Sequence, residues 1–206
     1  AHTSSFGVST RLIGAMIMTH GDDKGLVLPP AVAPTQVVFV PVGPWQKNPA
    51  ILDKIHELQA QLKAAGIRCR VDDSNNSPGF KFNEWELRGV PVRIECGPRD
   101  LENAQVMMKA RDLDDKVPVP FDNFLASVQA ELASMQGRLL EKARQMNQAN
   151  YYTDINSLEE LKAHIESKRA AGQVPGWVLA GWDGTEESEA KIKEETGFTT
   201  RNIPFA

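Results

Sequence analysis

Cysteine is scarce in this sequence, with only Cys69 and Cys96 among 206 residues. Two cysteines are too few for the disulfide framework that stabilises small secreted domains, and they fit a reducing compartment. Long apolar runs are missing as well, because no stretch approaches the roughly 18 uncharged apolar residues that a membrane span needs. We therefore expect a cytoplasmic protein that has no membrane among its partners.

An excess of positive charge is also missing. The net charge is −4, and residues 154–195 alone carry −5, so the rest of the chain is close to neutral. This balance argues against a protein that coats nucleic acid nonspecifically, but it is compatible with one local binding face. The sequence likewise lacks an initiator methionine and any basic region ahead of an apolar run, as a signal peptide would have. We interpret it as a piece of a longer protein.

The apolar pattern predicts alternating strands and helices after an opening helix that follows Ser9 and Thr10. Gly21, Gly25 and Pro29 mark a linker behind that helix. The expected strands lie at 35–43, 67–73, 90–96 and 104–112, and a helix bracketed by Asn48, Pro49 and Gly66 separates the first two. Strand, helix, strand within about 35 residues predicts a parallel pair of strands.

The second half of the chain has a different pattern. Apolar residues at steps of three and four from Leu125 to Met146 predict a long helix capped by Asp122. Ser157 and Glu160 have the spacing of a capping box that opens a second helix, which ends near Gly172. A strand, a turn, an acidic helix and a last strand are expected after it.

Three long motifs carry a resemblance to one family. They are "SSFGVSTRLIGAMIMTHGDDKGLVLPP" near the start, "GFKFNEWELRGVPVRIECGPRDLENAQV" at 79–106 and "KIKEETGFTTRNIPF" at 191–205. The first resembles motif 3 of the class II aminoacyl-tRNA synthetases as it occurs in prolyl-tRNA synthetases. The second resembles the anticodon-binding domain of that family, and the third its C-terminal domain in the eukaryotic and archaeal type. Three motifs in the right order over nearly the whole chain are far more specific than one short pattern.

The resemblance implies an α/β fold of three parts. The end of a class II catalytic domain and a linker occupy 1–32, and a three-layer, mixed-sheet anticodon-binding domain occupies 33–135. A connecting helix and a small, zinc-free α/β domain occupy 136–206. The implied parent is a ligase that activates proline with ATP and Mg²⁺ and transfers it to its tRNA. The parent is expected to be a homodimer formed mainly through its catalytic domain, and the piece alone is expected to be inactive and to contain no catalytic residue.

The motif 3 resemblance gives Arg11 the role of contacting ATP, with Ser9 and Thr10 at the helix entry. A guanidinium can neutralise phosphate charge and stack on a flat base, and a helix N-terminus favours an anion. From the residues alone, Arg11 is more typical of an ordinary surface arginine on a capped helix, and the resemblance is what favours the ATP contact. His20 and the two aspartates after it could suggest a metal or acid–base site, but they are more typical of a solvated turn.

The anticodon resemblance points to residues that could read guanines, since proline codons begin CC. An arginine fork matches the O6 and N7 atoms of guanine, and a carboxylate matches N1–H and N2–H₂. By resemblance, Phe82 stacks on a base, Glu86 and Arg93 read guanines, and Arg99, Asp100 and Lys116 complete the site. As core residues, Phe82 and Trp85 would instead pack inside the domain, and Arg93 would be a sheet arginine paired with a nearby carboxylate.

The C-terminal motif departs from the family at its metal positions. Many relatives hold zinc there through four cysteines, whereas Asp183 and Ser188 stand at the first two expected positions here. We therefore expect no metal site in this domain. The rival interpretation of the whole chain is a non-catalytic accessory or tRNA-binding protein with an anticodon-binding fold, for which an intact Arg11 would have no use.

Overall fold

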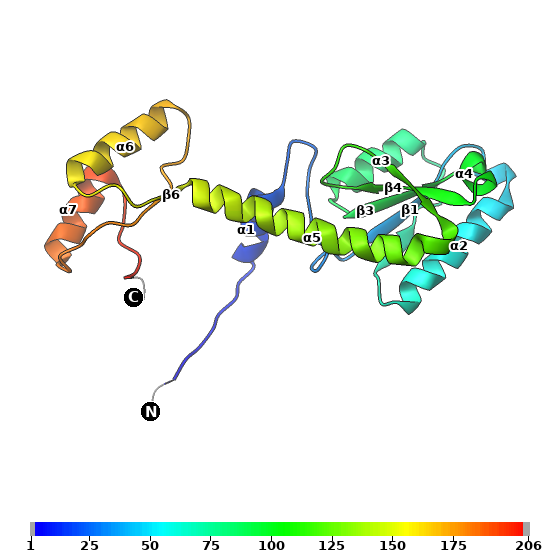
Figure 1. Cartoon of the computed structure of the whole chain (residues 1–206), viewed down its shortest axis with the longest axis horizontal. Helices are drawn as coiled ribbons and strands as arrows, with labels where there is room; N and C mark the ends of the chain where they lie inside the picture. Colours follow the sequence, from blue (N-terminus) through cyan, green and yellow to red (C-terminus); the bar gives the residue numbers. More distant parts are fainter. Residues whose placement is uncertain (1–2, 204–206) are drawn as a thin grey trace. The chain divides into compact units, whose positions relative to one another are not determined.

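The computed structural model of the chain describes residues 3–203 and divides into two compact units, residues 1–143 and residues 144–206 (Figure 1). Within the described residues, no helix combines the length and the apolar character that crossing a membrane would require.

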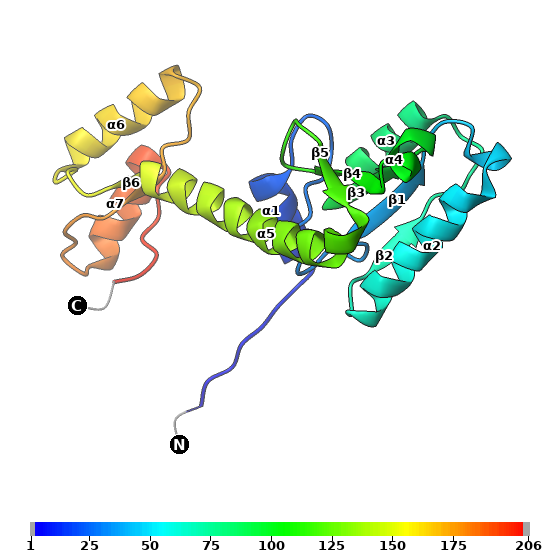
Figure 2. The ribbon, with the colours of Figure 1, turned by 45° about the vertical axis from the view of Figure 1, so that its right-hand side comes forward.

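A mixed five-stranded sheet organises the first unit (Figure 1, Figure 2). Its strands are β1 (Val37–Pro41), β2 (Cys69–Val71), β3 (Val92–Cys96), β4 (Gln105–Ala110) and β5 (Val117–Pro120), in the order β2-β1-β3-β4-β5. β1 pairs in parallel with both β2 and β3, whereas β3, β4 and β5 are antiparallel neighbours. The predicted parallel pair and the expected mixed α/β architecture are confirmed.

Two helices cover one face of this sheet. α2 (Pro49–Ala64) buries a stripe at Ile51, Ile55, Leu58 and Leu62, and it has Pro49 at its first position as predicted. α5 (Phe124–Ala149) follows the short 3-10 helix η2 (Phe121–Asn123), so Asp122 lies in that turn and is not the helix cap. Together with the inward side chains of the strands, these helices form the main apolar cluster of the unit. The core therefore lies between this sheet face and the α2–α5 layer.

The opposite face is covered over only part of its width. α3 (Pro78–Leu87) packs Phe82 and Trp85 against Val38, Val40 and Val90, which form a separate small cluster. α4 (Pro98–Glu102) follows β3, and η1 (Trp45–Lys47) precedes α2. Because side chains alternate between faces along a strand, the residues of β3 and β4 that share a face with Val38 lie beside α3.

The opening segment forms α1 (Arg11–His20), with no buried residue. The sequence pattern predicts a buried helix, but Leu12, Ile13, Ile17 and Met18 are all exposed. Residues 3–9, ahead of this helix, contain no strand. The helix therefore exists, but most of its apolar side chains are not buried by the described residues.

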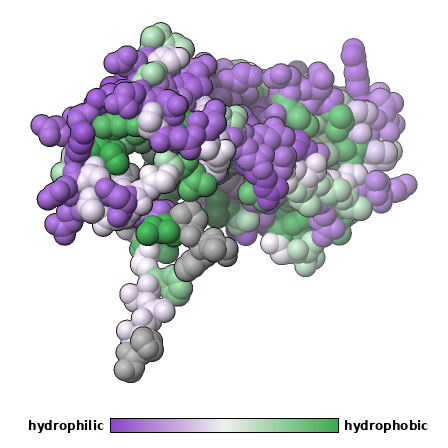
Figure 3. Space-filling view, turned by 60° about the vertical axis from the view of Figure 1, so that its left-hand side comes forward, coloured by the Kyte–Doolittle hydropathy of each residue, from purple (hydrophilic) through white to green (hydrophobic). Residues whose placement is uncertain are grey.

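The second unit pairs two short parallel strands, β6 (Tyr151–Tyr152) and β7 (Trp177–Val178), and adds α6 (Leu158–Ala170) and α7 (Glu186–Thr196). The predicted capping box of Ser157 and Glu160 is confirmed at the start of α6. Between α7 and residue 203 there is no strand, so the expected last strand is not found in that range. Figure 3 shows hydrophilic side chains over much of this unit, with hydrophobic patches between them.

Candidate nucleic-acid interface

The part of the sheet beside α3 carries polar side chains that face away from the main core. In the β3–β4 register, Arg93 lies opposite Lys109 and Glu95 lies opposite Met107. Register partners on neighbouring strands point to the same face, so Arg93, Glu95 and Lys109 share the face on which α3 packs. The alternation in "VRIEC" thus places two charged residues on a half-open sheet surface.

A buried carboxylate organises these cations. Glu95 is 4% exposed, and its Oε1 accepts hydrogen bonds from Arg93 Nε at 3.1 Å and Arg93 Nη2 at 3.0 Å. Its Oε2 accepts a third bond from Lys116 Nζ at 2.9 Å. A buried charge is stable when it is paired and hydrogen-bonded, which explains how Glu95 is tolerated in the sheet. Sequence reasoning missed Glu95, although its place two residues after Arg93 puts it on the same face.

Arg93 is therefore a sheet arginine paired with a nearby carboxylate, as the alternative interpretation proposes. The pairing leaves N–H donors of Arg93 free, because a guanidinium has five N–H donors and Nη2 carries two of them. The edge formed by Nη1 and Nη2 can still address a guanine while Nε and Nη2 hold Glu95.

Phe82 supports the same guanidinium. The Arg93 Cζ atom lies 4.1 Å from the centroid of the Phe82 ring, while Phe82 also packs on the cluster of Val38, Val40 and Val90. Phe82 is thus half-buried, and Arg93 covers one face of its ring. In this conformation, a base that stacks here would lie on the guanidinium instead of on that ring face.

Glu86 and Arg93 both line a small recess beside the sheet. Its lining comes from α3, β1, β3 and β4: Val38, Trp85, Glu86, Val90, Arg93, Lys109, Ala110 and Arg111. The recess has a volume of about 10 Å³, which is enough for roughly one water molecule and too small for a base. A base would therefore have to contact these groups at the mouth of the recess.

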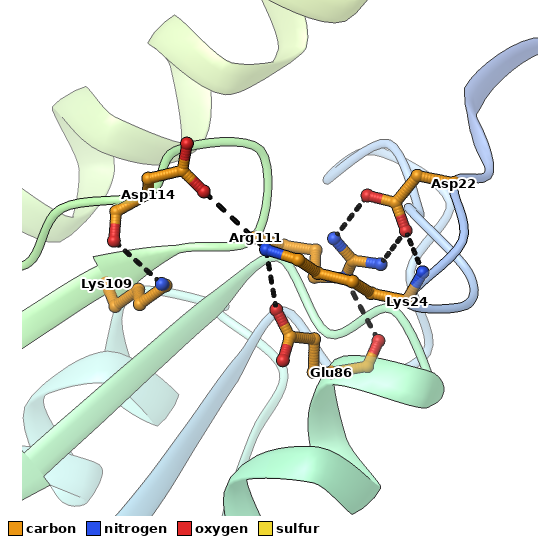
Figure 4. Close-up of polar contacts among 6 residues, drawn as sticks. All are labelled: Asp22, Lys24, Glu86, Lys109, Arg111 and Asp114. Carbon is orange, nitrogen blue, oxygen red and sulfur yellow. Dashed lines mark hydrogen bonds and ion pairs between the residues drawn. The ribbon is translucent and has the colours of Figure 1, made fainter.

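The linker after α1 reaches the far side of this recess. Asp22 accepts two bonds from Arg111, Nη1 to Oδ2 at 2.8 Å and Nη2 to Oδ1 at 2.6 Å. Lys24 lies 4.0 Å from a Glu86 carboxylate oxygen and 3.6 Å from Asp114 (Figure 4). The Arg111 side chain is 3% exposed, so this is a largely buried arginine held at the edge of the sheet.

The same contact sets the charge state of Asp22. Hydrogen bonds from the Arg111 side chain lower the pKa of Asp22 to about 2, and its bond from the Lys24 backbone acts in the same direction. The carboxylate is therefore ionised throughout the physiological range. The predicted turn at 20–25 is confirmed by the Asp22–Gly25 bridge, but the sequence did not indicate that Asp22 pairs with Arg111.

The remaining predicted anticodon residues lie apart from the recess. Lys116 belongs to the loop before β5 and joins the group through Glu95. Arg99 is exposed on α4, and Asp100 accepts a bond from the Gly97 N–H at 2.9 Å as part of the cap of that helix. The structure therefore brings together Phe82, Glu86, Arg93 and Lys116. Arg99 and Asp100 lie beyond the other end of β3.

Comparison with known families assigns both units. Residues 36–131 match the family model described as "Anticodon binding domain", which spans the sheet and all six predicted anticodon residues. Residues 158–206 match "Prolyl-tRNA synthetase, C-terminal". The chain belongs to the prolyl-tRNA synthetase family. The resemblance of the sequence motifs is thereby confirmed.

Individual relatives agree with this assignment. A "Proline--tRNA ligase" of Symbiobacterium thermophilum is 52% identical over 204 residues, which is 99% of this chain and 42% of the relative. Proteins of the same name from Lachnospira eligens and Acetoanaerobium sticklandii are each 46% identical over 205 residues, which is 41% of each relative. The chain thus spans about two fifths of the length of these prolyl-tRNA synthetases.

The three residues of the motif 3 resemblance lie at the start of α1. Ser9, Thr10 and Arg11 are all exposed, and Thr10 occupies the N-cap position without a side-chain capping bond. Two backbone N–H groups of the first helical turn are already bonded, Leu12 N–H to the Ser9 oxygen at 3.1 Å and Ile13 N–H to the Thr10 oxygen at 3.0 Å. No other functional residue predicted for this family lies on α1.

The two positions where family members often carry zinc ligands have a different chemistry here. Ser188 Oγ donates to Asp183 Oδ1 at 2.5 Å, and Thr185 Oγ1 donates to the same oxygen at 2.9 Å. Trp182 Nε1 in turn donates to Ser188 Oγ at 2.8 Å. Across residues 3–203, no group of three or more potential ligand side chains is arranged to hold a metal ion. A hydrogen-bonded turn at the N-terminus of α7 thus occupies the place of the first ligand pair.

Proposed function

We propose that this chain supplies anticodon recognition to a proline–tRNA ligase, and that the face formed by α3, β3 and β4 reads the guanines of the anticodon. The observation that carries the proposal is that Glu86 and Arg93 line one recess, inside the region that matches the anticodon-binding family. These residues place a carboxylate and a guanidinium at the same recess, and this combination can address both edges of a splayed-out guanine.

The geometry supports different tasks for the cations around Glu95. Arg93 is held from two directions, by Phe82 and by Glu95, so its free edge has a defined orientation. Lys116 is 51% exposed at its side chain and ends in a flexible ammonium, which suits a phosphate oxygen better than a base edge. Arg93 and Glu86 are therefore assigned to base reading and Lys116 to the backbone of the RNA.

Substitution of Arg93 and substitution of Lys116 should have different effects on RNA binding. Arg93→Ala should weaken binding to a stem-loop RNA with the GG anticodon by about 1–3 kcal/mol and leave binding to a loop with both guanines replaced almost unchanged. Lys116→Ala should weaken both complexes alike and reduce their salt dependence. Fluorescence titration of both loops at two salt concentrations measures this.

Arg88→Ala is a suitable control, because Arg88 also lies at the end of α3 but pairs with Glu84 outside the recess. It should preserve the preference for the GG loop. Equal losses on both loops for Arg93→Ala would remove Arg93 from base reading and leave it a structural partner of Glu95.

The activity of the longer protein is a second part of the proposal. By family membership it would activate proline with ATP and Mg²⁺ as a cytoplasmic homodimer, and Arg11 with Ser9 and Thr10 would contact ATP. The exposed apolar face of α1 would then pack on the rest of the catalytic domain. The rival function is a tRNA-binding accessory protein of the same fold, and it does not require Arg11.

Pyrophosphate exchange separates these functions. In the full-length protein, Arg11→Ala should lower proline-dependent ATP–pyrophosphate exchange by ~10²-fold or more, since one preorganised charge is lost from the transition state. The 206-residue chain alone should show no exchange. Unchanged exchange in the Arg11 variant would overturn the ATP contact, and exchange by the chain alone would overturn its assignment as the non-catalytic part.

A further inference from the structure

A buried arginine links the linker turn to the helix that carries Glu86. The Arg111 Nε atom donates to the backbone oxygen of Glu86 at 3.0 Å, while its two terminal nitrogens bind the Asp22 carboxylate (Figure 4). Asp22 and Arg111 are 89 residues apart in the chain. The Asp22–Arg111 contact therefore forms only in the folded domain. Through its Nε atom, Arg111 also binds the backbone of Glu86, a residue assigned to guanine reading.

The chemistry of the helix end explains why a cation is placed there. Glu86 is the last residue but one of α3, where backbone carbonyls carry partial negative charge. Its carbonyl oxygen accepts from the Gly89 N–H at 3.0 Å as well as from Arg111, so the guanidinium supplies a second, charged donor. A guanidinium is a planar fork, so binding Asp22 through Nη1 and Nη2 also fixes the direction of Nε. The Asp22 carboxylate thus determines where the Arg111 donor meets the Glu86 carbonyl.

The linker holds the neighbouring backbone as well. Leu26 N–H donates to the Leu87 oxygen at 3.0 Å, and Leu28 N–H donates to the Gly89 oxygen at 3.2 Å. Lys24 extends from the same linker toward the Glu86 side chain. The main chain directly after Glu86 is therefore held by residues 26–28, which lie outside the region that matches the anticodon-binding family.

We propose that the Asp22–Arg111 pair positions Glu86 for guanine recognition, so that the linker after α1 is a structural part of the anticodon site. This inference rests on the proposed function. Asp22 and Arg111 act through Glu86 and need not touch the RNA themselves.

The test uses Asp22→Asn and Arg111→Lys in the 206-residue chain, with two RNA hairpins as probes: one with the GG anticodon and one with both guanines replaced by adenine. An asparagine has one acceptor oxygen and no charge, so it cannot reproduce the two-oxygen contact with Arg111, and a lysine has no fork with which to bind Asp22 and the Glu86 carbonyl together. The wild type should prefer the GG hairpin by roughly 5- to 150-fold, the range of one bidentate base contact. Each variant should lose at least about three-fold of that preference, with binding to the adenine hairpin unchanged.

A double-mutant cycle distinguishes positioning from general damage. In a Glu86→Gln background, Asp22→Asn should have no further effect on the preference, because the group that it positions has already been altered. Arg138→Lys is the matched control, since Arg138 makes a comparable two-point contact with Asp112 in the same unit. It should lower the melting temperature and leave the preference intact.

Different outcomes would overturn the positioning role of Asp22 and Arg111 and the proposed function. A wild-type chain that binds both hairpins equally would overturn the proposed function and this inference with it. A discriminating wild type together with fully discriminating Asp22→Asn and Arg111→Lys variants would overturn the inference alone, as would an equal effect of Asp22→Asn in both Glu86 backgrounds.

Discussion

At the scale of single residues, the buried side chain of Glu95 fixes the positions of two cations. It binds Arg93 and Lys116 at once, although these two cations are proposed to have different tasks on the RNA. Loss of its charge would leave Arg93 without the partner that orients it. Under the proposed function, selectivity would thus depend on an acid that is not itself assigned to RNA contact.

The pH dependence of the Asp22–Arg111 pair is a prediction at this scale. The pKa of Asp22 is lowered to about 2 in the folded protein, below the ordinary value of about 3.9, so folding favours the ionised form. The stabilisation is complete above about pH 4 and is lost as the pH falls through 2. Asp22→Asn should therefore cost about 1 kcal/mol at pH 7, a value limited by the partial exposure of Asp22.

Urea unfolding of wild type and Asp22→Asn at several pH values measures this difference. It should shrink between pH 4 and pH 2, where the wild type loses the ion pair itself. Asp23→Asn, at the neighbouring exposed position, is the control. A difference that stays constant down to pH 2 would contradict the assigned role of the charge.

At the scale of elements, the close approach of the linker to the end of α3 depends on a glycine. Gly89 has a φ of +69°, and a Cβ atom there would lie 2.6 Å from the Leu26 backbone. Gly66, behind α2, has a similar φ of +77°, but a Cβ there would meet no atom within 4 Å. The two positions share the backbone conformation and differ only in the space beside it.

Gly89→Ala should therefore destabilise the chain by more than Gly66→Ala. The left-handed conformation alone costs an alanine about 1 kcal/mol, and displacement of the Leu26 backbone should add roughly 2 kcal/mol or more at Gly89. Chemical denaturation of both variants measures the two costs. If they were equal, the contact between linker and α3 would not contribute to stability.

At the scale of the whole molecule, we ask whether the C-terminal unit needs a bound metal ion for its stability. The turn formed by Asp183, Thr185 and Ser188 caps α7 through the bond from Ser188 N–H to Thr185 Oγ1 at 3.2 Å. Hydrogen bonds from Ser188 and Thr185 also lower the pKa of Asp183. The side chains that stand at the expected zinc positions thus bind each other.

Elemental analysis of the purified chain should find well under one zinc per molecule, and a chelator should leave the melting temperature unchanged. Thr185→Ala should instead destabilise this unit, because it removes the α7 cap. Stoichiometric zinc, or a melting temperature that falls on chelation, would show that the unit is held together by a metal.

The sequence by itself determined the elements and the family. Periodicity and capping signals located β1, α2 and α6, because these depend on local preferences and on the burial of one face. The motifs also gave the family, since they preserve residues in order along the chain. The same local signals failed at α1 and after α7, where the pattern alone does not say whether a partner surface is present.

Only the tertiary structure decided which charged residues meet. The Asp22–Arg111 and Lys116–Glu95 contacts join segments that are far apart in the chain, and no local pattern encodes them. The physical reason is that a carboxylate or guanidinium has no preferred neighbour along the chain. Its partner is set by strand register and by the approach of the linker to α3, which follow from packing the whole unit.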